Sequence, residues 1–364
     1  MKLQSSKEDI LKGISIVQNA ISTKTTLPIL SNLLLETIDN KLKITGTDLD
    51  IGIITYVNVK IMDEGSITLP AKKFMDIIKE LPESPVTISV RKNNMVNITC
   101  EKTQFKVMGI PRDDFPSLPQ LKDEKRIEVK QGVLRDMLAM TSFAMSRDET
   151  RYVLNGVYML FKKDRVRLVA TDGRRLALIE RPIKFEKGMD RNIIIPLKTV
   201  QELHRTLKDD GNLVISIGGN QAMFDLGESI IISRLIEGEF PNYEQVIPKE
   251  VKEKVVVDRE KLLLATKRAS ILTSHESQGI KMDIDKGRMV ISKQSPDIGE
   301  AREELDVEYK GSPFSIGFNP NYIIDALKNI NQSSLGFELE NPEKPGVIRI
   351  GDNYVYVVLP MQLA

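Results

Sequence analysis

Residues 154–158, Leu-Asn-Gly-Val-Tyr, repeat the pattern of residues 31–35, Ser-Asn-Leu-Leu-Leu, with the two asparagines 123 residues apart. The pairs Thr47-Asp48 and Thr171-Asp172 recur at nearly the same separation, 124 residues. A third, fainter copy places Gln278-Gly279-Ile280 one further interval along the chain. Solenoid repeats have periods of only about 20 to 50 residues. The sequence therefore predicts three tandem copies of a whole domain.

The length of 364 residues supports the same division. Single hydrophobic cores stop growing at roughly 250 to 300 residues, and a third of this chain is close to the commonest domain size. We predict domains at residues 1–122, 127–249 and 252–364. The stretches between them, residues 116–124 and 241–253, carry proline and charge, as domain boundaries usually do.

The charges nearly cancel, with 52 basic and 51 acidic residues. This balance excludes a uniformly basic surface, so contact with a polyanion requires the charges to be segregated onto different faces. Cys100 is the only cysteine, which excludes an internal disulfide and fits a reducing compartment. The polar N-terminus and the lack of a long apolar run argue against secretion and membrane insertion, so we expect a cytoplasmic location.

Apolar residues recur at helical spacing twice in each unit, and a helix is expected to open every unit. Ser6 and Asp9 resemble a capping box at the first of these helices. Between the helices lie short alternating runs joined by turn residues such as Asp39-Asn40, a pattern typical of antiparallel hairpins. The predicted fold class is α+β, with three tandem similar domains that each place two helices on one face of an antiparallel sheet.

The sequence contains no pattern typical of catalysis or of metal binding. Asp48 and Asp172 occupy equivalent Thr-Asp positions in separate repeats, where a turn-forming role is more natural than an acid–base pair. His204, His275 and a single cysteine indicate neither a metal centre nor a cysteine nucleophile with its base. No phosphate-binding loop or dinucleotide fingerprint occurs. We therefore expect no catalytic residues, no metal and no cofactor.

Three stretches carry a resemblance to a known family: Thr171-Asp172-Gly173-Arg174-Arg175-Leu176, Phe240-Pro241-Asn242-Tyr243 and Leu359-Pro360-Met361-Gln362-Leu363. With the repeats, they make the chain resemble, over essentially its whole length, the bacterial sliding clamps, the beta subunits of DNA polymerase III. The resemblance implies the DNA clamp fold and a head-to-tail homodimer that closes into a ring around duplex DNA. It also implies a non-enzymatic processivity factor. Such a factor slides on double-stranded DNA without sequence preference and tethers the replicative DNA polymerase, the clamp loader and repair proteins, which bind a groove through short linear motifs.

Carried over position by position, the resemblance implies three sets of site residues. The partner-peptide groove comprises Leu154, Thr171, Gly173, Arg174, Arg175, Leu176, Pro241, Val246, Val357, Leu359 and Met361. The contacts to DNA comprise Lys24, Lys72, Lys73, Arg151 and Lys198. The dimer interface joins Phe105 and Val107 of one protomer to Ile271 and Leu272 of its mate.

Plainer interpretations remain open for several of these residues. Leu154, Val246, Val357, Val107 and Leu272 also fit an ordinary domain core, and a charged helix face is often only a solvated face. Two residues depart from the family pattern at the rim of the groove: Arg174 stands where many relatives have histidine, and Gln362 where many have arginine. Two other functions are also open: a repeat scaffold without DNA at its centre, and a hydrolase that uses Asp48 or Asp172.

Overall fold

The computed structural model describes residues 1–21, 27–119, 121, 126–185, 190–249, 253–274, 277–296 and 298–362. Contacts group the chain into two compact units. The first comprises residues 1–135 and 201–235, and the second comprises residues 136–200 and 236–364. The division falls within two helices, α3 (Gln131–Ala139) and α4 (Leu197–Thr206).

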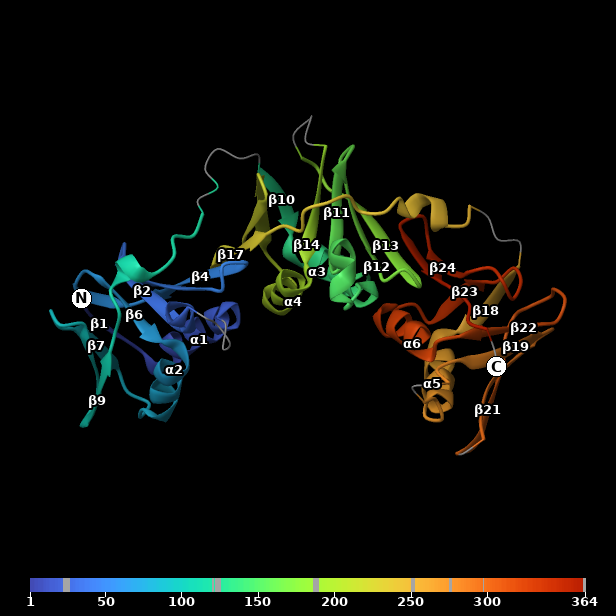
Figure 1. Cartoon of the computed structure of the whole chain (residues 1–364), viewed down its shortest axis with the longest axis horizontal. Helices are drawn as coiled ribbons and strands as arrows, with labels where there is room; N and C mark the ends of the chain where they lie inside the picture. The colour runs from blue at the N-terminus through green and yellow to red at the C-terminus, as the bar shows by residue number, and fades with distance from the viewer. Residues whose placement is uncertain are drawn as a thin grey trace. The chain divides into compact units, whose positions relative to one another are not determined.

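The first unit contains two antiparallel sheets and the helices α1 (Lys7–Val17) and α2 (Ala71–Glu80), which pack side by side (Figure 1). Within the described residues, its larger sheet has eight strands in the order β10-β15-β16-β17-β4-β3-β2-β6, and its smaller sheet has five in the order β5-β1-β7-β8-β9. The strands are β1 (Lys2–Ser5), β2 (Asn32–Ile38), β3 (Lys41–Thr47), β4 (Ile51–Asn58), β5 (Lys60–Asp63), β6 (Ser66–Pro70), β7 (Val86–Val90), β8 (Met95–Cys100), β9 (Thr103–Met108), β10 (Arg126–Lys130), β15 (Asn212–Gly218), β16 (Gln221–Asp225) and β17 (Ser229–Arg234).

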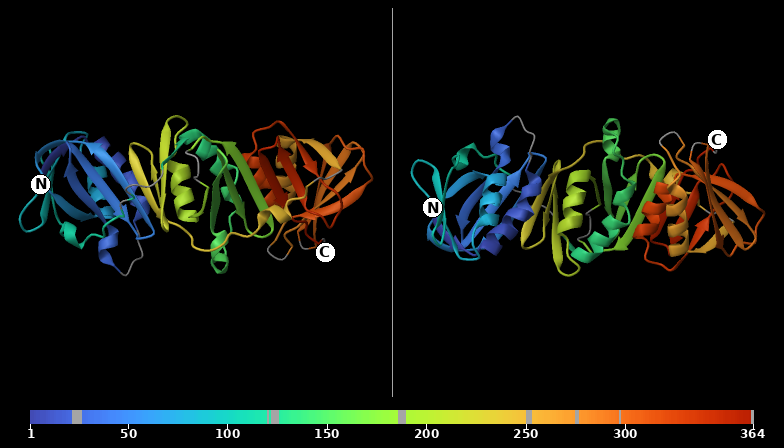
Figure 2. Two further views of the ribbon diagram at one scale, coloured as in Figure 1. Left: turned by 90° about the horizontal axis from the view of Figure 1, so that it is seen from above. Right: turned by 90° about the horizontal axis from the view of Figure 1, so that it is seen from below.

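The second unit has the same kind of construction, with the helices α5 (Arg259–Ser270) and α6 (Pro320–Asn329) packed together and visible side by side in the view from below (Figure 2). Counting only described residues, its larger sheet has eight strands in the order β14-β11-β12-β13-β25-β24-β23-β18, and its smaller sheet has four in the order β21-β20-β19-β22. The strands are β11 (Gly156–Lys162), β12 (Arg165–Thr171), β13 (Arg175–Pro182), β14 (Arg191–Pro196), β18 (Lys254–Asp258), β19 (Ile280–Asp285), β20 (Arg288–Ser295), β21 (Gly299–Asp306), β22 (Phe314–Phe318), β23 (Ser334–Glu338), β24 (Gly346–Ile350) and β25 (Tyr354–Val358).

Each large sheet combines four strands of one repeat with four strands of the next. In the first unit, β4 of the first repeat pairs with β17 of the second, with Gly52 opposite Ile232. In the second unit, β13 of the second repeat pairs with β25 of the third, with Leu176 opposite Val357. The sheets therefore run without a break across the sequence repeats, which explains why contacts form two units from three repeats.

Local sequence accounts for where the elements begin and turn. Ser6 accepts a hydrogen bond from the backbone N–H of Asp9 (3.0 Å) and so caps α1, as its sequence pattern predicts. Asp39 and Asn40, with φ of 47° and 60°, make the tight turn between β2 and β3. Asparagine and aspartate tolerate this left-handed conformation better than other residues with a side chain.

All six predicted helices are present, but the prediction that each unit opens with a helix is wrong. The strands β1, β10 and β18 precede α1, α3 and α5. Each strand has only four or five residues, and β10 buries only Ile127 and Val129. Two alternating apolar positions are too few to separate a short strand from a polar lead-in to the helix. Helical spacing also predicts that Met140, Ala144 and Leu272 belong to these helices, but α3 ends at Ala139 and α5 at Ser270.

In the part of the chain that the structure describes, no helix is long and apolar enough to span a membrane.

The cap of α1 yields a stability prediction. Replacing Ser6→Ala removes the acceptor for the N–H of Asp9 and should lower the free energy of unfolding by about 1 kcal/mol in a denaturant titration. Ser15→Ala, at an exposed position of the same helix, is the matched control and should change it by no more than a few tenths of a kcal/mol. Equal effects of the two substitutions would contradict the capping role.

Candidate peptide-binding groove

The turn between β12 and β13 is held by its own side chains. Asp172 Oδ1 accepts hydrogen bonds from the backbone N–H groups of Arg174 (2.9 Å) and Arg175 (3.0 Å). Thr171 Oγ1 donates to the carbonyl of Arg175 (2.6 Å) and accepts from the N–H of Gly173 (3.1 Å). Gly173 has φ of 84°, a conformation that glycine adopts without steric cost. Residues 171–175 therefore form a locally determined loop.

The equivalent turn of the first repeat has the same hydrogen bonds. Asp48 Oδ1 accepts from the N–H groups of Asp50 (3.0 Å) and Ile51 (2.9 Å), and Thr47 Oγ1 donates to the carbonyl of Ile51 (2.9 Å). The prediction that Asp48 and Asp172 form turns is confirmed. Each carboxylate accepts from the backbone of its own turn, so neither is arranged as a general acid or base for the other.

Arg175 anchors this loop to the body of the second unit. Its Nε donates to Asp172 Oδ2 (3.0 Å), its Nη1 to Asp325 Oδ2 (2.8 Å) and its Nη2 to the carbonyl of Phe143 (2.6 Å). The guanidinium also lies over the ring of Tyr322, 4.5 Å from its centroid. Burial alone would lower the pKa of Arg175, but the carboxylate partners outweigh it and raise that pKa. The loop and α6 are thereby joined through one permanently charged side chain.

An apolar cavity of about 170 Å³ lies beside the loop. Its lining comes from both repeats that share the sheet: Leu154, Thr171, Gly173, Arg174, Arg175, Leu176, Pro241, Asn242, Tyr243, Val246, Val357 and Leu359. Leu176 and Val357, each 3% exposed, are opposite one another on β13 and β25. Val246 and Leu359 are 55% and 43% exposed. The cavity thus has a buried apolar floor and accessible apolar residues, which suits the side chains of a docked peptide.

The second linker completes the cavity because it crosses the face of the large sheet. The ring of Phe240 stacks on that of Tyr158 at 4.9 Å, and Tyr243 lies 5.9 Å from Tyr158. Arg167 Nη1 donates to Tyr243 Oη (3.0 Å) and to Glu244 Oε1 (2.8 Å). Pro241, Asn242 and Tyr243 are therefore fixed at the cavity by aromatic packing and by a charged hydrogen bond.

The last described residues of the chain pass along the same cavity. The N–H of Leu359 donates to the carbonyl of Arg174 (2.9 Å), and the N–H of Met361 donates to the carbonyl of Gly317 (2.8 Å). The first bond holds the segment after β25 against the 171–175 loop, and the second holds it against β22.

The structure brings ten of the eleven predicted groove residues together in this cavity. The exception is Met361, which is half-buried two residues after Leu359 and does not line the cavity. It adds Asn242 and Tyr243, which the sequence interpretation missed. Both belong to the Phe240-Pro241-Asn242-Tyr243 stretch that carries the family resemblance, so this motif could have indicated them.

The predicted DNA contacts are distributed over both units. Lys72 and Lys73 are exposed on α2, whose other face buries Phe74 and Ile78. Arg151 donates through Nη1 to the carbonyl of Asp172 (2.7 Å) and pairs with Asp148, so it lies against the groove loop. Lys198 is half-buried in the first turn of α4, and Lys24 lies outside the described residues.

The predicted interface residues lie on an edge strand and at the end of a helix. Phe105 and Val107 belong to β9, the last strand of the five-stranded sheet, and Phe105 is 36% exposed. Ile271 and Leu272 follow the last residue of α5, and Ile271 is 75% exposed. Among the described residues, no group of three or more metal-ligating side chains occurs.

Three family models of the DNA polymerase III beta subunit match the chain in order: the N-terminal domain at residues 1–119, the central domain at residues 128–242 and the C-terminal domain at residues 244–362. A beta sliding clamp from Pseudomonas putida is 34% identical over 362 residues, with 98% of each chain covered. One from Chlamydia muridarum is 30% identical over 363 residues, covering 100% of this chain and 99% of the relative.

Solved structures give the same result. The DNA polymerase sliding clamp of Bacillus subtilis has a TM-score of 0.96 at 29% identity, and 100% of both chains is covered. The DNA polymerase III subunit beta of Bartonella birtlesii, solved with griselimycin bound, has a TM-score of 0.94 at 32% identity over 100% of both chains. Three such domains in tandem define the DNA clamp fold. The chain belongs to the family of DNA polymerase III beta subunits, the bacterial beta sliding clamps.

The network around Arg175 yields the second prediction. Arg175→Met leaves two carboxylates and the carbonyl of Phe143 without their donor and should lower the free energy of unfolding by about 2 kcal/mol or more. Arg174→Met, at the exposed neighbouring position, is the matched control and should change it by less than about 0.5 kcal/mol. Equal denaturation midpoints for the two variants would contradict the anchoring role of Arg175.

Proposed function

We propose that two copies of this chain close head to tail into a ring around duplex DNA and bind partner proteins at the cavity beside the 171–175 loop. As a member of its family the chain is a processivity factor and not an enzyme. It slides along double-stranded DNA and tethers the replicative polymerase, the clamp loader and repair proteins, which carry short linear motifs. The observation that carries the proposed site is the convergence of ten residues, chosen from the sequence, on one cavity.

The cavity suits several partners for physical reasons. Its buried floor offers apolar area, and burial of such area contributes about 25 cal/mol per Å². The nearby Met361 has a flexible thioether side chain that adapts to different ligands. Arg174 is exposed at the rim, so an acidic residue of a peptide is favoured beside it. These features support a peptide groove made by the eleven predicted residues together with Asn242 and Tyr243.

The proposed domain boundaries at 1–122, 127–249 and 252–364 place both linkers across the large sheets. The residues after Phe115 lie against the sheet of the first unit and those after Phe240 against that of the second. Each linker then forms part of the wall of the cavity beside it.

DNA binding requires cations that bind phosphates without base readout. Lys72 and Lys73 are the clearest candidates because both are exposed on one helix. Some other helix cations are paired with acids, as Arg268 is with Glu303, which limits the positive field there. Lys24, Lys198 and Arg151 complete the proposed set.

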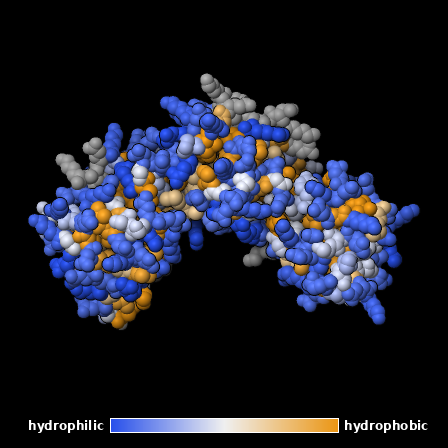
Figure 3. All heavy atoms as spheres, turned by 180° about the vertical axis from the view of Figure 1, so that it is seen from behind, coloured by the Kyte–Doolittle hydropathy of each residue, from blue (hydrophilic) through white to orange (hydrophobic). Residues whose placement is uncertain are grey.

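The proposed ring joins two free sheet edges. β9 and β21 are each paired on only one side within the described residues, and unpaired edges are templates for another strand. Lys106 is exposed on β9, whereas Glu300 and Glu304 are exposed on β21. Figure 3 shows apolar side chains at the end of the second unit where α5 and the β20–β21 hairpin lie, and Ile271 and Ile298 are 75% and 61% exposed. Opposite charge and shared apolar area favour pairing of β9 with the partner's β21.

We place the protein in the cytoplasm because it is proposed to encircle chromosomal DNA and because its one cysteine is a free, buried thiol.

The groove is tested by Val246→Glu. This residue is more than half exposed, so the substitution should leave the fold intact while placing a charge where a partner's apolar side chain docks. Isothermal calorimetry with a clamp-binding peptide of the polymerase should show at least a tenfold loss of affinity, equivalent to roughly 1.4 kcal/mol. Met62→Glu, at an exposed apolar position of the first unit, is the control. Unchanged affinity of the Val246→Glu variant would reject the groove.

The ring is tested by Leu272→Lys. A lysine at the end of α5 should prevent burial of the interface, so analytical ultracentrifugation should give the mass of a single protomer. Leu264→Lys places the same charge at an exposed position inside α5 and should leave the dimer intact. A dimer mass for the Leu272→Lys variant would reject this interface.

A further inference from the structure

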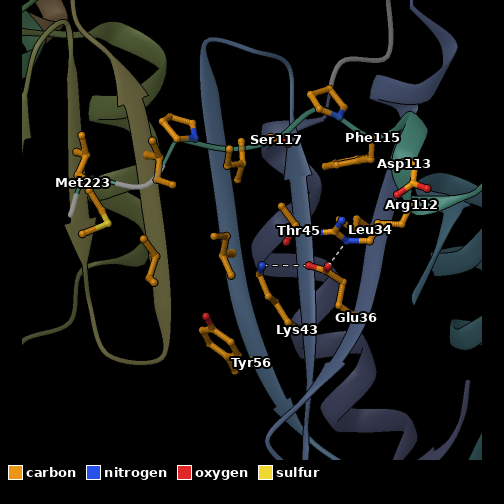
Figure 4. A pocket seen from close by; sticks show the side chains of 17 residues that line it. Leu34, Glu36, Lys43, Thr45, Tyr56, Arg112, Asp113, Phe115, Ser117 and Met223 are labelled. Carbon is orange, nitrogen blue, oxygen red and sulfur yellow. Dashed lines mark hydrogen bonds and ion pairs between the residues drawn. The ribbon is translucent and has the colours of Figure 1, made fainter. Parts of the chain in front are cut away.

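A second, larger hollow of about 520 Å³ lies on the large sheet of the first unit, beside residues 115–119 of the first linker (Figure 4). Its volume is in the range of ligand-binding cavities. It has an apolar wall that includes Leu34, Ile54, Phe115, Ile230 and Ile232, and a charged end formed by Glu36, Lys43 and Arg112. We call it the first-unit hollow. It shares no residue with the cavity of the second unit.

The internal repeat gives each wall of this hollow a counterpart in the second unit. Strand pairing matches β2 to β11 one residue away from the alignment of the two asparagines, because Asn32 is opposite Pro70 as Gly156 is opposite Pro196. In this register Leu34 is paired with Thr45 as Tyr158 is paired with Val169. Phe115-Pro116 likewise corresponds to Phe240-Pro241 at the start of the other linker. The matched positions, first unit then second, are Leu34 and Tyr158, Lys43 and Arg167, Tyr56 and Glu180, Phe115 and Phe240, and Leu118 and Tyr243.

In the second unit the chain fills the matched space with its own side chains. The rings of Tyr158, Phe240 and Tyr243 pack on one another, with centroids 4.9, 5.9 and 6.3 Å apart. Arg167 donates to both members of the neighbouring pair Tyr243 and Glu244. An aromatic residue followed by an acidic one therefore occupies this place on the sheet.

In the first unit the same positions fill less of the matched space, although Leu34 and Phe115 are each only 6% exposed. Leu34 is smaller than a tyrosine, and Leu118 packs against Gly52, where an added Cβ would lie 2.7 Å from Leu118 Cδ2. Among the described residues, Phe115 contacts no other aromatic ring. The ring of Phe115 thus lacks the two partners that Phe240 has.

The charged end of the first-unit hollow has two cations on one carboxylate. Lys43 Nζ lies 3.0 Å from Glu36 Oε2, and Arg112 Nε lies 2.6 Å from Glu36 Oε1 (Figure 4). Burial would raise the pKa of Glu36, but the hydrogen bonds from Arg112 and Lys43 outweigh it and lower that pKa. Arg167 of the second unit pairs with Glu180 on the neighbouring strand. Lys43 has Tyr56 at the matched position, which offers no carboxylate. Asp113 also lines the hollow, so the two cations face two carboxylates and this end carries no net charge.

Thr45 supplies an independent indication of a ligand. It is 3% exposed and lines the hollow, and among the described residues its Oγ1 has no hydrogen-bond partner. The matched residue of the second unit is Val169, which has no hydroxyl to satisfy. A buried hydroxyl without a partner is costly, and rotation about its Cα–Cβ bond turns it toward a bound polar group.

We propose that the first-unit hollow is a second docking site, and that its occupant is a partner protein's peptide in which an aromatic residue is followed by an acidic one. The aromatic ring packs in the hollow against the partly exposed Ile230 and Met223. The carboxylate binds Lys43 and Arg112. The ligand thereby takes the place that Tyr243 and Glu244 take in the second unit.

The test uses the full-length protein with methyl-labelled isoleucine and methionine. Acetyl-Tyr-Glu-amide should shift the resonances of Ile54, Ile230, Ile232 and Met223, with a Kd in the roughly millimolar range or tighter. Acetyl-Tyr-Gln-amide, which lacks the carboxylate, should bind roughly tenfold more weakly, because hydrogen bonds to charged groups are the stronger ones.

Two variants show whether the shifts come from this site. Leu34→Tyr restores the residue of the second unit and should abolish the shifts, and Lys43→Met should weaken binding roughly tenfold. Val246→Glu alters only the groove of the second unit and should leave the shifts unchanged. The two sites are therefore tested independently, and failure of one proposal does not imply failure of the other. Absence of shifts, or shifts that persist in folded Leu34→Tyr protein, would overturn the proposal. Shifts with 4-hydroxyphenylacetate but not with the dipeptide would overturn the peptide as the occupant and indicate a small aromatic acid instead.

Discussion

The pairing of β4 with β17, and of β13 with β25, is the constraint on which the rest of the structure depends. It is made of ordinary backbone hydrogen bonds between strands of different repeats. In each unit the linker between the two repeats lies against the sheet that these repeats share. The linkers thereby become walls of the two cavities described above.

The same construction has produced two different surfaces. In the second unit, Tyr243 turns toward Tyr158 and leaves Leu176 and Val357 as the floor of a groove. In the first unit, Leu118 packs on Gly52, the residue matched to Leu176, and so covers the place of that groove. The exchange of glycine for leucine between β4 and β13 is therefore one of the differences that decide which part of each sheet stays open. Divergence of the repeats at a few side chains has given one fold two distinct sites.

Much of the fold could be predicted from the sequence, because its signals are local. The repeated Thr-Asp pair forms the same hydrogen-bonded turn in both repeats, and Ser6 caps α1 as its spacing indicates. The opening strands were missed because two alternating residues such as Ile127 and Val129 carry too little pattern. Pairing between repeats was not predictable either. A strand's alternation shows which face is buried, but not which edge will find a partner from another repeat.

The candidate groove was predictable mainly through family resemblance, residue by residue. That route found the loop around Gly173 and the floor at Leu176, but it missed Asn242 and Tyr243, whose positions depend on the stacking of Phe240 on Tyr158. The first-unit hollow had no sequence signal, because it arises from what Leu34 and Leu118 fail to fill. Such spaces become visible only when the two units are compared in three dimensions.

The central claim is that the chain holds DNA by enclosing it, so that retention depends on topology. The most direct measurement loads the protein with its clamp loader onto a nicked circular plasmid, isolates the complex in high salt, and then cuts the DNA once with a restriction enzyme. Enclosure predicts that the protein stays on the circle and is lost when the DNA becomes linear, because a ring slides off free ends. Equal retention on circular and linear DNA, or equal loss from both, would contradict the account.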